Sequence, residues 1–549
     1  MKKLNKTVIS FVLIILASLT IISLYWLREA GGYLRFSDAA KFADIARNLV
    51  SGEGYRANFI FFTPNVLIKE LPAYVFYIPP LMPLFIAGSF LLFGITDFSV
   101  IITSGVLYVL LVYAVFLLGR KLFGRLVGVL SGMAVASSSA FLDYATSGAS
   151  EVLLAFEIVL AFYLFTLRKK WADVVAFLIL VTMYFTRPQA FIYIAGGILY
   201  WLLLRFKISK SLRYFIGVLV LGFFIDRLVL APLSGNFFLY SILTRGANAI
   251  SQVPVSEAVS GQLRGKVVVG TTIVDVFKKT FYNLYNFYKL LPQIASPYMW
   301  GLFIIGLFRW GKNRIENSLK LATLFMVIIT FLVTALTIPF FRYLHPVIPF
   351  VYLFATATII WIVREMINGQ WARIKPRSIV MKIRKEPLIV GISSFLVFLF
   401  VIGQMFGTIL LDSRFKADRT NEGKPPVYVS LSWILKENTN SEDIVITNLD
   451  TWGSWYGERK TVWFPLEPNQ LIPPEGQENP FDAIYLTSYL MDDENYYMGD
   501  EWRQVFYNPK NPENEFIAEN YELKEMFEID AENVYERQNV RAVLLTRKN

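Results

Sequence analysis

The sequence is poor in the residues that most often build redox and metal sites. It contains no cysteine and one histidine in 549 residues. The lack of cysteine excludes disulfides and Cys-ligated metal or iron–sulfur centres, and a single histidine excludes a zinc site built on several histidines. Charged residues make up 17% of the chain and hydrophobic residues 55%, with a mean hydropathy of +0.48. This balance is typical of an integral membrane protein.

The positive charge is unevenly divided along the chain. The formal net charge is +11, but residues 412–549 hold 14 Lys and Arg against 26 Asp and Glu. Residues 1–411 therefore hold 39 basic against 16 acidic residues, and they are also the apolar part. An excess of Lys and Arg beside apolar runs favours orientation in a membrane over binding of nucleic acid.

Long apolar runs predict the spanning helices. A span needs about 20 mostly apolar residues, and residues 8–27 meet this without one charge. No small-residue cleavage site follows them, so we expect a retained first helix and not a removed signal peptide. Ten further runs bring the predicted number of spans to about eleven: 99–119, 126–143, 151–167, 172–186, 188–204, 213–231, 292–308, 319–339, 344–363 and 387–411.

The segment 79–94 decides the predicted topology. It is short and opens with two prolines, so it is either a span or a helix that lies in the interface. If it does not span, five basic segments fall on the side of the N-terminus: 120–125, 167–171, 205–213, 309–314 and 364–385. The positive-inside rule therefore favours a re-entrant or interfacial helix, with a cytoplasmic N-terminus.

This predicted topology places the remaining loops and the tail outside the cell. The outer parts are 28–98, 143–151, the turn at Arg187, 232–291, 340–345 and 412–549. Within the tail, DIVIT and DAIYLT have the character of buried strands and VSLSWILKEN has helical spacing. We predict an all-α polytopic membrane domain over 1–411 and an extracytoplasmic α/β domain over 412–549.

The first outer loop contains an amphipathic helix. In residues 36–55, apolar side chains recur three and four positions apart until Gly52 and Gly54 end the run. Ser37 or Asp38 is the predicted N-cap. A carboxylate held at the edge of the bilayer is also a candidate functional group, so a capping role and a catalytic role stay open for Asp38 on these facts.

Several motifs in order resemble the GT-C glycosyltransferases. More narrowly, the chain resembles the dolichyl-phosphate-mannose protein mannosyltransferases and the bacterial lipid A aminoarabinose transferases. The resemblance covers most of the chain. It is carried by Asp38, Phe42, Ala43, Ala46, Leu49, Gly52 and Gly54, then Pro79-Pro80-Leu81 and Phe93-Gly94, then GRKLFG (119–124), TSGASEVLLAF (146–156) and FRYLHPVIP (341–349).

The resemblance implies a reaction and roles for two carboxylates. The family moves a sugar from a polyprenyl-phosphate donor, dolichyl- or undecaprenyl-phosphate, to a protein, glycan or lipid acceptor. Asp38 would be the base of an inverting single displacement. Glu151 would bind a divalent metal with Asp38, position the sugar or orient the acceptor. Helix-dipole stabilisation of Glu151 at the start of a span stays open as a structural alternative.

The donor phosphate requires cations at the same face. Arg342 is the preferred clamp, because a guanidinium grips phosphate bidentately, and Arg187 is a second candidate. A snorkelling role is the structural alternative for both arginines. Relatives often carry His or Lys before the first proline of the second helix, where this chain has Tyr77-Ile78. The site would then be completed by Lys69, Arg56 or Arg342. Further substrate contacts are expected from Tyr343, His345 and Asp44.

Other readings remain open at this point. A divalent metal, Mg²⁺ or Mn²⁺, is a candidate cofactor, although two carboxylates do not establish a metal site. Expected partners are the lipid-linked donor, the acceptor and membrane lipids, in the plasma membrane, with no nucleic acid. A flippase of lipid-linked sugars would show paired halves with broken helices, and an oligosaccharyltransferase would typically show a paired-acid motif and a WWD-type motif. The sequence shows none of these features.

Overall fold

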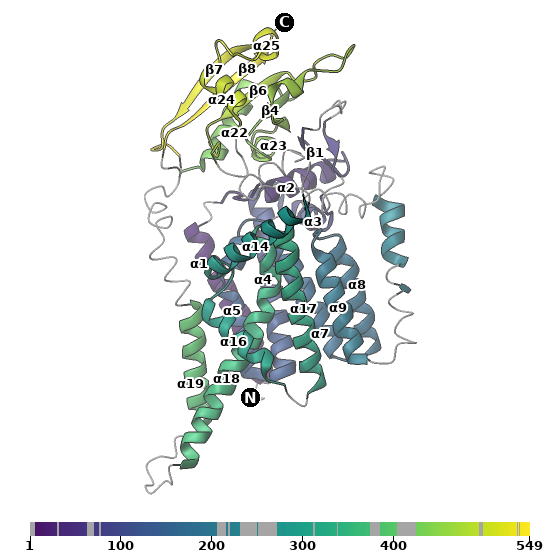
Figure 1. Ribbon diagram of the computed structural model, residues 1–549, viewed down its shortest axis with the longest axis vertical. Coiled ribbons are helices and arrows are strands. Elements are labelled where there is room, and N and C mark those ends of the chain that lie inside the picture. The colour runs from purple at the N-terminus through teal and green to yellow at the C-terminus, as the bar shows by residue number, and fades with distance from the viewer. Residues whose placement is uncertain are drawn as a thin grey trace.

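The chain forms a helical bundle with a β-sheet unit stacked on one end (Figure 1). The computed structural model describes residues 6–29, 32–62, 71–75, 78–205, 216–217, 220–230, 250, 272–310, 313–337, 339–373, 385–402, 424–492, 498–534, 536 and 538–548. Figure 1 shows helices α2 and α3 between the bundle and the sheet unit.

The bundle is built mostly from apolar helices. Its elements are α1 (Lys6–Glu29), α2 (Ser37–Val50), α3 (Leu81–Phe93), α4 (Asp97–Phe123), α5 (Arg125–Ala136), α6 (Ser139–Ala145), α7 (Glu151–Thr166), α8 (Lys170–Tyr184), α9 (Ala190–Arg205), the π-helix η1 (Asp226–Leu230), α14 (Ile273–Lys289), α15 (Leu291–Ile294), α16 (Pro297–Phe308), α17 (Arg314–Leu336), the 3₁₀ helix η2 (Phe341–Val347), α18 (Ile348–Arg373), α19 (Lys385–Val397) and the π-helix η3 (Phe398–Ile402).

Part of the predicted set of spans meets the length and hydropathy expected of a membrane-crossing helix. In the described residues three helices do so: 97–123, 314–336 and 341–368. The helices 125–136 and 139–145 meet it together, as a pair bent by 64°. Several other predicted spans are shorter apolar helices, and much of the predicted run 213–231 lies outside the described residues. The number of eleven therefore stays a prediction.

Helix α3 does not carry the chain from one end of the bundle to the other. Leu34, shortly before α2, donates its backbone N–H to the Tyr456 hydroxyl, and Asp97, at the start of α4, accepts a hydrogen bond from Trp455. The segment from Leu34 to Asp97 thus begins and ends beside the same part of the sheet unit. With 13 residues, α3 is about 20 Å long, which is less than a bilayer core. Which side of a membrane this end meets stays a prediction.

The sheet unit contains six strands, one of which comes from the first loop. The order is β2 (Phe59–Phe61), β5 (Lys460–Trp463), β4 (Ile444–Thr447), β6 (Ala483–Thr487), β8 (Val540–Arg547) and β7 (Tyr521–Ile529). The first four are parallel, and β8 and β7 add antiparallel. Helices α22 (Val427–Asn438), α23 (Trp452–Trp455), η4 (Pro468–Leu471), α24 (Asp500–Tyr507) and α25 (Glu515–Asn520) accompany it, and β1 (Arg56–Ala57) pairs with β3 (Ala73–Tyr74) nearby.

The pairing of β2 with β5 ties the first loop to the tail. Phe59 lies opposite Thr461 and Phe61 opposite Trp463. Phe59 is fully buried, so this edge strand also supplies a core side chain to the sheet unit. The predicted boundary at residues 411 and 412 is therefore crossed in space by residues 59–61.

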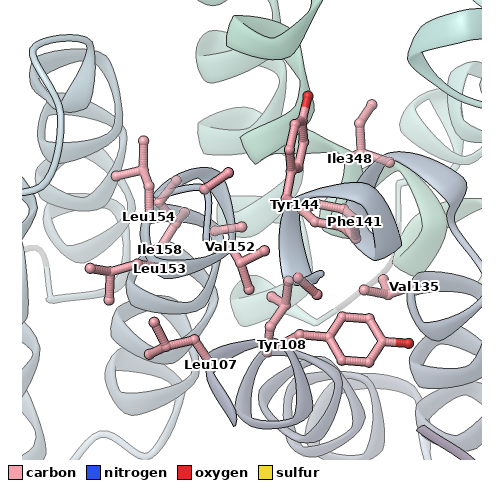
Figure 2. Packing of buried hydrophobic residues seen from close by; sticks show 14 of the residues in the cluster. Leu107, Tyr108, Val135, Phe141, Tyr144, Val152, Leu153, Leu154, Ile158 and Ile348 are labelled. Atoms are coloured by element: carbon pink, nitrogen blue, oxygen red, sulfur yellow. The ribbon is translucent and has the colours of Figure 1, made fainter. Parts of the chain in front are cut away.

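The bundle core fixes the helices that carry the site. Figure 2 shows side chains of α4, α5, α6, α7 and α18 interdigitating, with Tyr108 and Tyr144 among them. The Tyr108 hydroxyl donates to the carbonyl of Ala136 at 2.6 Å, which satisfies a buried polar group. Gly119 and Gly128 let α4 and α5 approach closely, because a Cβ on Gly128 would lie 2.7 Å from the Phe116 carbonyl oxygen.

Candidate active site

Asp38 lies in the first turn of α2, where it does not act as the N-cap. The helix begins at Ser37, its N-cap position is Phe36, and no described side chain caps it. The capping prediction for Ser37 or Asp38 is therefore wrong. The Asp38 carboxylate instead accepts a hydrogen bond from Arg342 at 2.6 Å between Oδ2 and Nη2.

A chain of alternating charges leads from Asp38 into the bundle. Arg342 Nε lies 3.7 Å from Glu151 Oε1, and Arg187 Nη1 lies 2.7 Å from the same oxygen. We call these four residues the ion network. The side chains of Asp38 and Arg342 are 29% and 27% exposed, whereas those of Glu151 and Arg187 are 1% and 9% exposed. The network is thus open at Asp38 and Arg342 and closed at Glu151 and Arg187.

Four different parts of the chain supply the ion network, with Asp38 coming from α2. Glu151 begins α7, and Arg187 follows α8 in the turn before α9. Arg342 belongs to η2, which packs against α7 and α17. Packing of the apolar core fixes these helix ends, and this packing brings the two carboxylates and the two guanidiniums together. All four side chains were predicted as site residues.

The positive charges determine the ionisation of Asp38. Burial alone would raise the pKa of Asp38, but the charges of Arg342, Lys41 and Arg187 outweigh it and hold that pKa well below its ordinary value. Asp38 is therefore ionised at neutral pH. In this structure the Asp38 carboxylate contacts a guanidinium. A general base would have to contact the acceptor hydroxyl instead.

Arg187 keeps unused hydrogen-bonding capacity inside the site. Its Nη1 also donates to Ser150 Oγ at 2.9 Å, but its buried Nε has no hydrogen-bond partner among the described residues. A buried donor left without a partner is costly, and an anionic ligand oxygen would satisfy it.

Two further predicted residues lie next to the ion network. The ring of Tyr343 has the guanidiniums of Arg187 and Arg342 at 5.5 and 5.7 Å from its centroid, within cation–π range. His345 is 5% exposed, its Nδ1 is 2.5 Å from the Tyr144 hydroxyl, and its Nε2 is 3.4 Å from the Gln293 carbonyl oxygen. Tyr343 thus orients both arginines, while His345 packs behind them.

The remaining predicted residues lie elsewhere. Arg56 donates to the Tyr74 hydroxyl at 3.1 Å and stacks on that ring, in the small β1–β3 pair. Asp44 is fully buried and accepts hydrogen bonds from Asn58 and Arg47, an arrangement typical of a structural carboxylate. The structure does not bring these two side chains into contact with the ion network in the described residues. Lys69 lies outside the described residues.

Sequence reasoning missed two side chains beside Asp38. Lys41 Nζ is 3.9 Å from Asp38 Oδ1 and sits over the rings of Phe59 and Phe61. Its spacing of three residues from Asp38 on a helix was a readable signal. Asp450 follows β4 with a backbone φ of 55°, and burial raises its pKa although Lys41 opposes this. No sequence pattern pointed to Asp450.

The sheet unit holds the start of α2 by three hydrogen bonds. Thr451 Oγ1 donates to the Ser37 carbonyl at 2.5 Å, and Trp452 Nε1 donates to the Leu34 carbonyl at 3.2 Å. The Leu34 N–H donates to Tyr456 at 2.7 Å. The backbone that carries Asp38 is therefore positioned by residues 451–456, more than four hundred positions away in the sequence.

The carboxylates as they lie do not fit a divalent metal. Asp38 and Glu151 each face a guanidinium within 2.7 Å, and a cation between them would be repelled by two arginines. In the described residues no group of three or more His, Cys, Asp or Glu is arranged to hold a metal ion. Metal binding by Asp38 and Glu151 stays a prediction.

Comparison with known proteins points to one class. The family described as dolichyl-phosphate-mannose-protein mannosyltransferase matches residues 78–229. The crystal structure of ArnT from Cupriavidus metallidurans bound to undecaprenyl phosphate is 12% identical, with a TM-score of 0.54 over 97% of both chains. The oligosaccharyltransferase of Archaeoglobus fulgidus in complex with zinc and sulfate is 15% identical, with a TM-score of 0.55 over 89% of this chain and 69% of that one. No curated protein matches.

The chain therefore has the fold of the GT-C membrane glycosyltransferases, an apolar helical bundle with charged residues gathered beneath a sheet unit. At identities of 12% and 15%, the structural comparison shows the fold alone. Within this class, the resemblance to the dolichyl-phosphate-mannose protein mannosyltransferases and to ArnT, predicted from the sequence, is confirmed.

Proposed function

We propose that the protein transfers a sugar from a polyprenyl-phosphate donor to a protein, glycan or lipid acceptor at the outer face of the plasma membrane. The observation that carries the proposal is the ion network, in which one partly exposed carboxylate is joined to two arginines and a buried glutamate. The family match and the fold support a glycosyltransferase. The undecaprenyl phosphate bound to ArnT supports a lipid-phosphate donor.

The proposed reaction is a single displacement with inversion at the anomeric carbon. Asp38 takes the proton of the acceptor hydroxyl as its oxygen attacks, and the bond between the anomeric carbon and the phosphate oxygen breaks. The electron pair leaves with the polyprenyl phosphate. Arg342 and Arg187 stabilise the charge that develops on that phosphate, which is where preorganised cations lower a barrier most.

The arrangement also supports a switch between resting and reactive states. With Arg342 bound to Asp38, the carboxylate is a poor base because its pKa is lowered. A donor phosphate competes for the same guanidinium, so its arrival draws Arg342 away and leaves Asp38 facing the acceptor. Glu151, ion-paired with Arg187, keeps the second guanidinium in place during this exchange.

No step in this scheme needs a metal. The two guanidiniums supply the positive charge that a divalent cation would supply, and they are already beside the carboxylates. Metal dependence is tested by chelation, with transfer measured before and after.

The direct test uses purified protein in nanodiscs with labelled polyprenyl-phosphate sugars and an acceptor extract. Wild type should transfer label, and Asp38→Asn should lose most transfer while it still binds polyprenyl phosphate. A parallel reaction with a polyprenyl-pyrophosphate oligosaccharide distinguishes an oligosaccharyltransferase, which the fold alone does not exclude. A labelled donor appearing across a vesicle membrane without transfer would instead favour a flippase.

A further inference from the structure

A polar cleft lies at the seam between the sheet unit and the bundle. It has a volume of about 590 Å³, and its lining includes Arg47 of α2, Asp97 of α4, and Trp433, Lys436 and Trp455 of the sheet unit. We call it the seam cleft. Because it is formed jointly by the two parts of the molecule, it exists only when they are docked.

The seam cleft is separate from the ion network. None of the four network residues lines it. Asp38 lies in the first turn of α2 and Arg47 in its last turn, nine positions later, which corresponds to about 14 Å along the helix axis. A ligand in the cleft therefore does not meet the reacting atoms. Because α2 is buried from Ala39 to Ala46, a chain-like ligand that reaches both the cleft and Asp38 must run beside this helix and not along it.

The charged side chains that line the cleft already have ionic or hydrogen-bond partners. Lys436 lies 2.7 Å from Glu458, and the carboxylate of Asp97 accepts hydrogen bonds from Trp455 and Tyr456 at 2.7 and 2.8 Å. Lys460 is likewise 2.6 Å from Glu442. The lining holds four basic and three acidic side chains, so its charge is nearly balanced and attracts an anion little, yet it offers many donors and acceptors to a neutral ligand rich in hydroxyl groups.

An aromatic platform completes this polar surface. Trp433 lines the cleft and is 42% exposed, although indole rings are usually well buried. A flat aromatic face beside paired polar groups suits a sugar ring, whose C–H face packs on the indole while its hydroxyls bond to the charged groups.

The cleft also opens beside an apolar surface. Ile95 lines it, and the preceding α3 exposes Leu91 and Leu92, each at 77%. Side chains of this kind suit contact with lipid. A glycan could therefore reach the cleft either free or attached to a lipid in the adjacent membrane leaflet.

From these observations we infer that the seam cleft binds the non-reacting part of a glycan acceptor and so holds its acceptor hydroxyl near Asp38. The second part of this inference, the placing of the acceptor hydroxyl near Asp38, rests on the proposed glycosyltransferase function. Because this contact is made equally in the ground state and in the transition state, its loss should appear in the acceptor KM.

The test measures glycan binding and transfer separately. Fluorescently labelled manno- and chito-oligosaccharides, free or attached to a lipid in nanodiscs, are titrated against full-length wild type, Trp433→Ala and Trp171→Ala. Trp171 is the matched control because its indole is 55% exposed but lies at the start of α8, away from the cleft. Polyprenyl phosphate binding is measured on all three proteins.

We expect Trp433→Ala to weaken glycan binding about tenfold and to raise the acceptor KM by a similar factor, with polyprenyl phosphate binding and kcat unchanged. Trp171→Ala should behave as wild type. Binding that depends on Trp433 in a protein that transfers no sugar would support the cleft and refute the enzymatic function. Transfer with unchanged acceptor KM and glycan affinity in Trp433→Ala would refute the cleft alone, and so would the absence of binding by every free and lipid-attached glycan.

Discussion

Replacing Arg342 by glutamine should raise the pKa of Asp38. Burial raises that pKa and Arg342 provides the largest opposing charge, so removing the guanidinium moves the pKa upward. A hydrogen bond to a charged group contributes about 1.5–3 kcal/mol, and one pKa unit corresponds to about 1.36 kcal/mol. Both side chains are more than a quarter exposed, so solvent screening favours the lower end of this energy range. The expected rise in the pKa of Asp38 is therefore about one unit.

The assay is the pH dependence of kcat/KM for the donor, which reports ionisation of the free enzyme. A base with a lowered pKa stays active as pH falls through the ordinary aspartate range, so wild type should lose activity only at low pH. In Arg342→Gln the acidic limb should move to higher pH. Arg187→Gln is the control, because Arg187 pairs with Glu151, and it should move the limb less. Identical acidic limbs in wild type and Arg342→Gln would refute the coupling between Arg342 and Asp38.

Three further outcomes follow from the described contacts. Asp44→Ala should destabilise the protein by about 3 kcal/mol in thermal unfolding, because it removes a buried acceptor and leaves the partly buried Asn58 and Arg47 without it; unchanged unfolding would contradict the structural role. Thr451→Val should lower kcat while costing about 1 kcal/mol in stability, because the bond to Ser37 is lost; an unchanged kcat would show that the sheet unit does not position Asp38. Chelation of divalent metals should leave transfer intact, and loss of transfer restored by Mg²⁺ or Mn²⁺ would show that a metal enters the site.

The composition and order of motifs were sufficient to predict the class of fold. Apolar runs predicted most of the bundle helices, and the strand-like segments 443–447 and 482–487 correspond to β4 and β6. These predictions depend on local hydrophobic patterning, which the sequence carries directly. The count of spans is harder to predict, because helices such as α5 and α16 are shorter than the apolar runs that suggested them.

The grouping of the four network residues was predicted for a related reason. The predicted topology brings the helix ends that carry Asp38, Glu151, Arg187 and Arg342 to one end of the bundle. Their shared side of the predicted membrane was enough to group them. Sidedness did not separate them from Asp44 and Arg56, which lie at the same end but face other partners.

Contacts between distant segments could not be predicted. The pairing of residues 59–61 with β5 and the hydrogen bond from Thr451 to Ser37 join parts of the chain about four hundred positions apart. Neither leaves a local pattern, because edge pairing and backbone hydrogen bonds make few demands on side-chain identity. For this reason the sequence did not predict that the sheet unit contacts the backbone that carries Asp38.

The central claim is that Asp38 is the catalytic base of a transfer from a polyprenyl-phosphate sugar. The most direct measurement is single-turnover transfer of a labelled donor sugar by wild type and Asp38→Asn at equal occupancy of the donor site. The structure predicts that Asp38→Asn binds polyprenyl phosphate and transfers at least about a hundredfold more slowly, the scale expected for loss of a general base. Transfer by Asp38→Asn at the wild-type rate would contradict the claim.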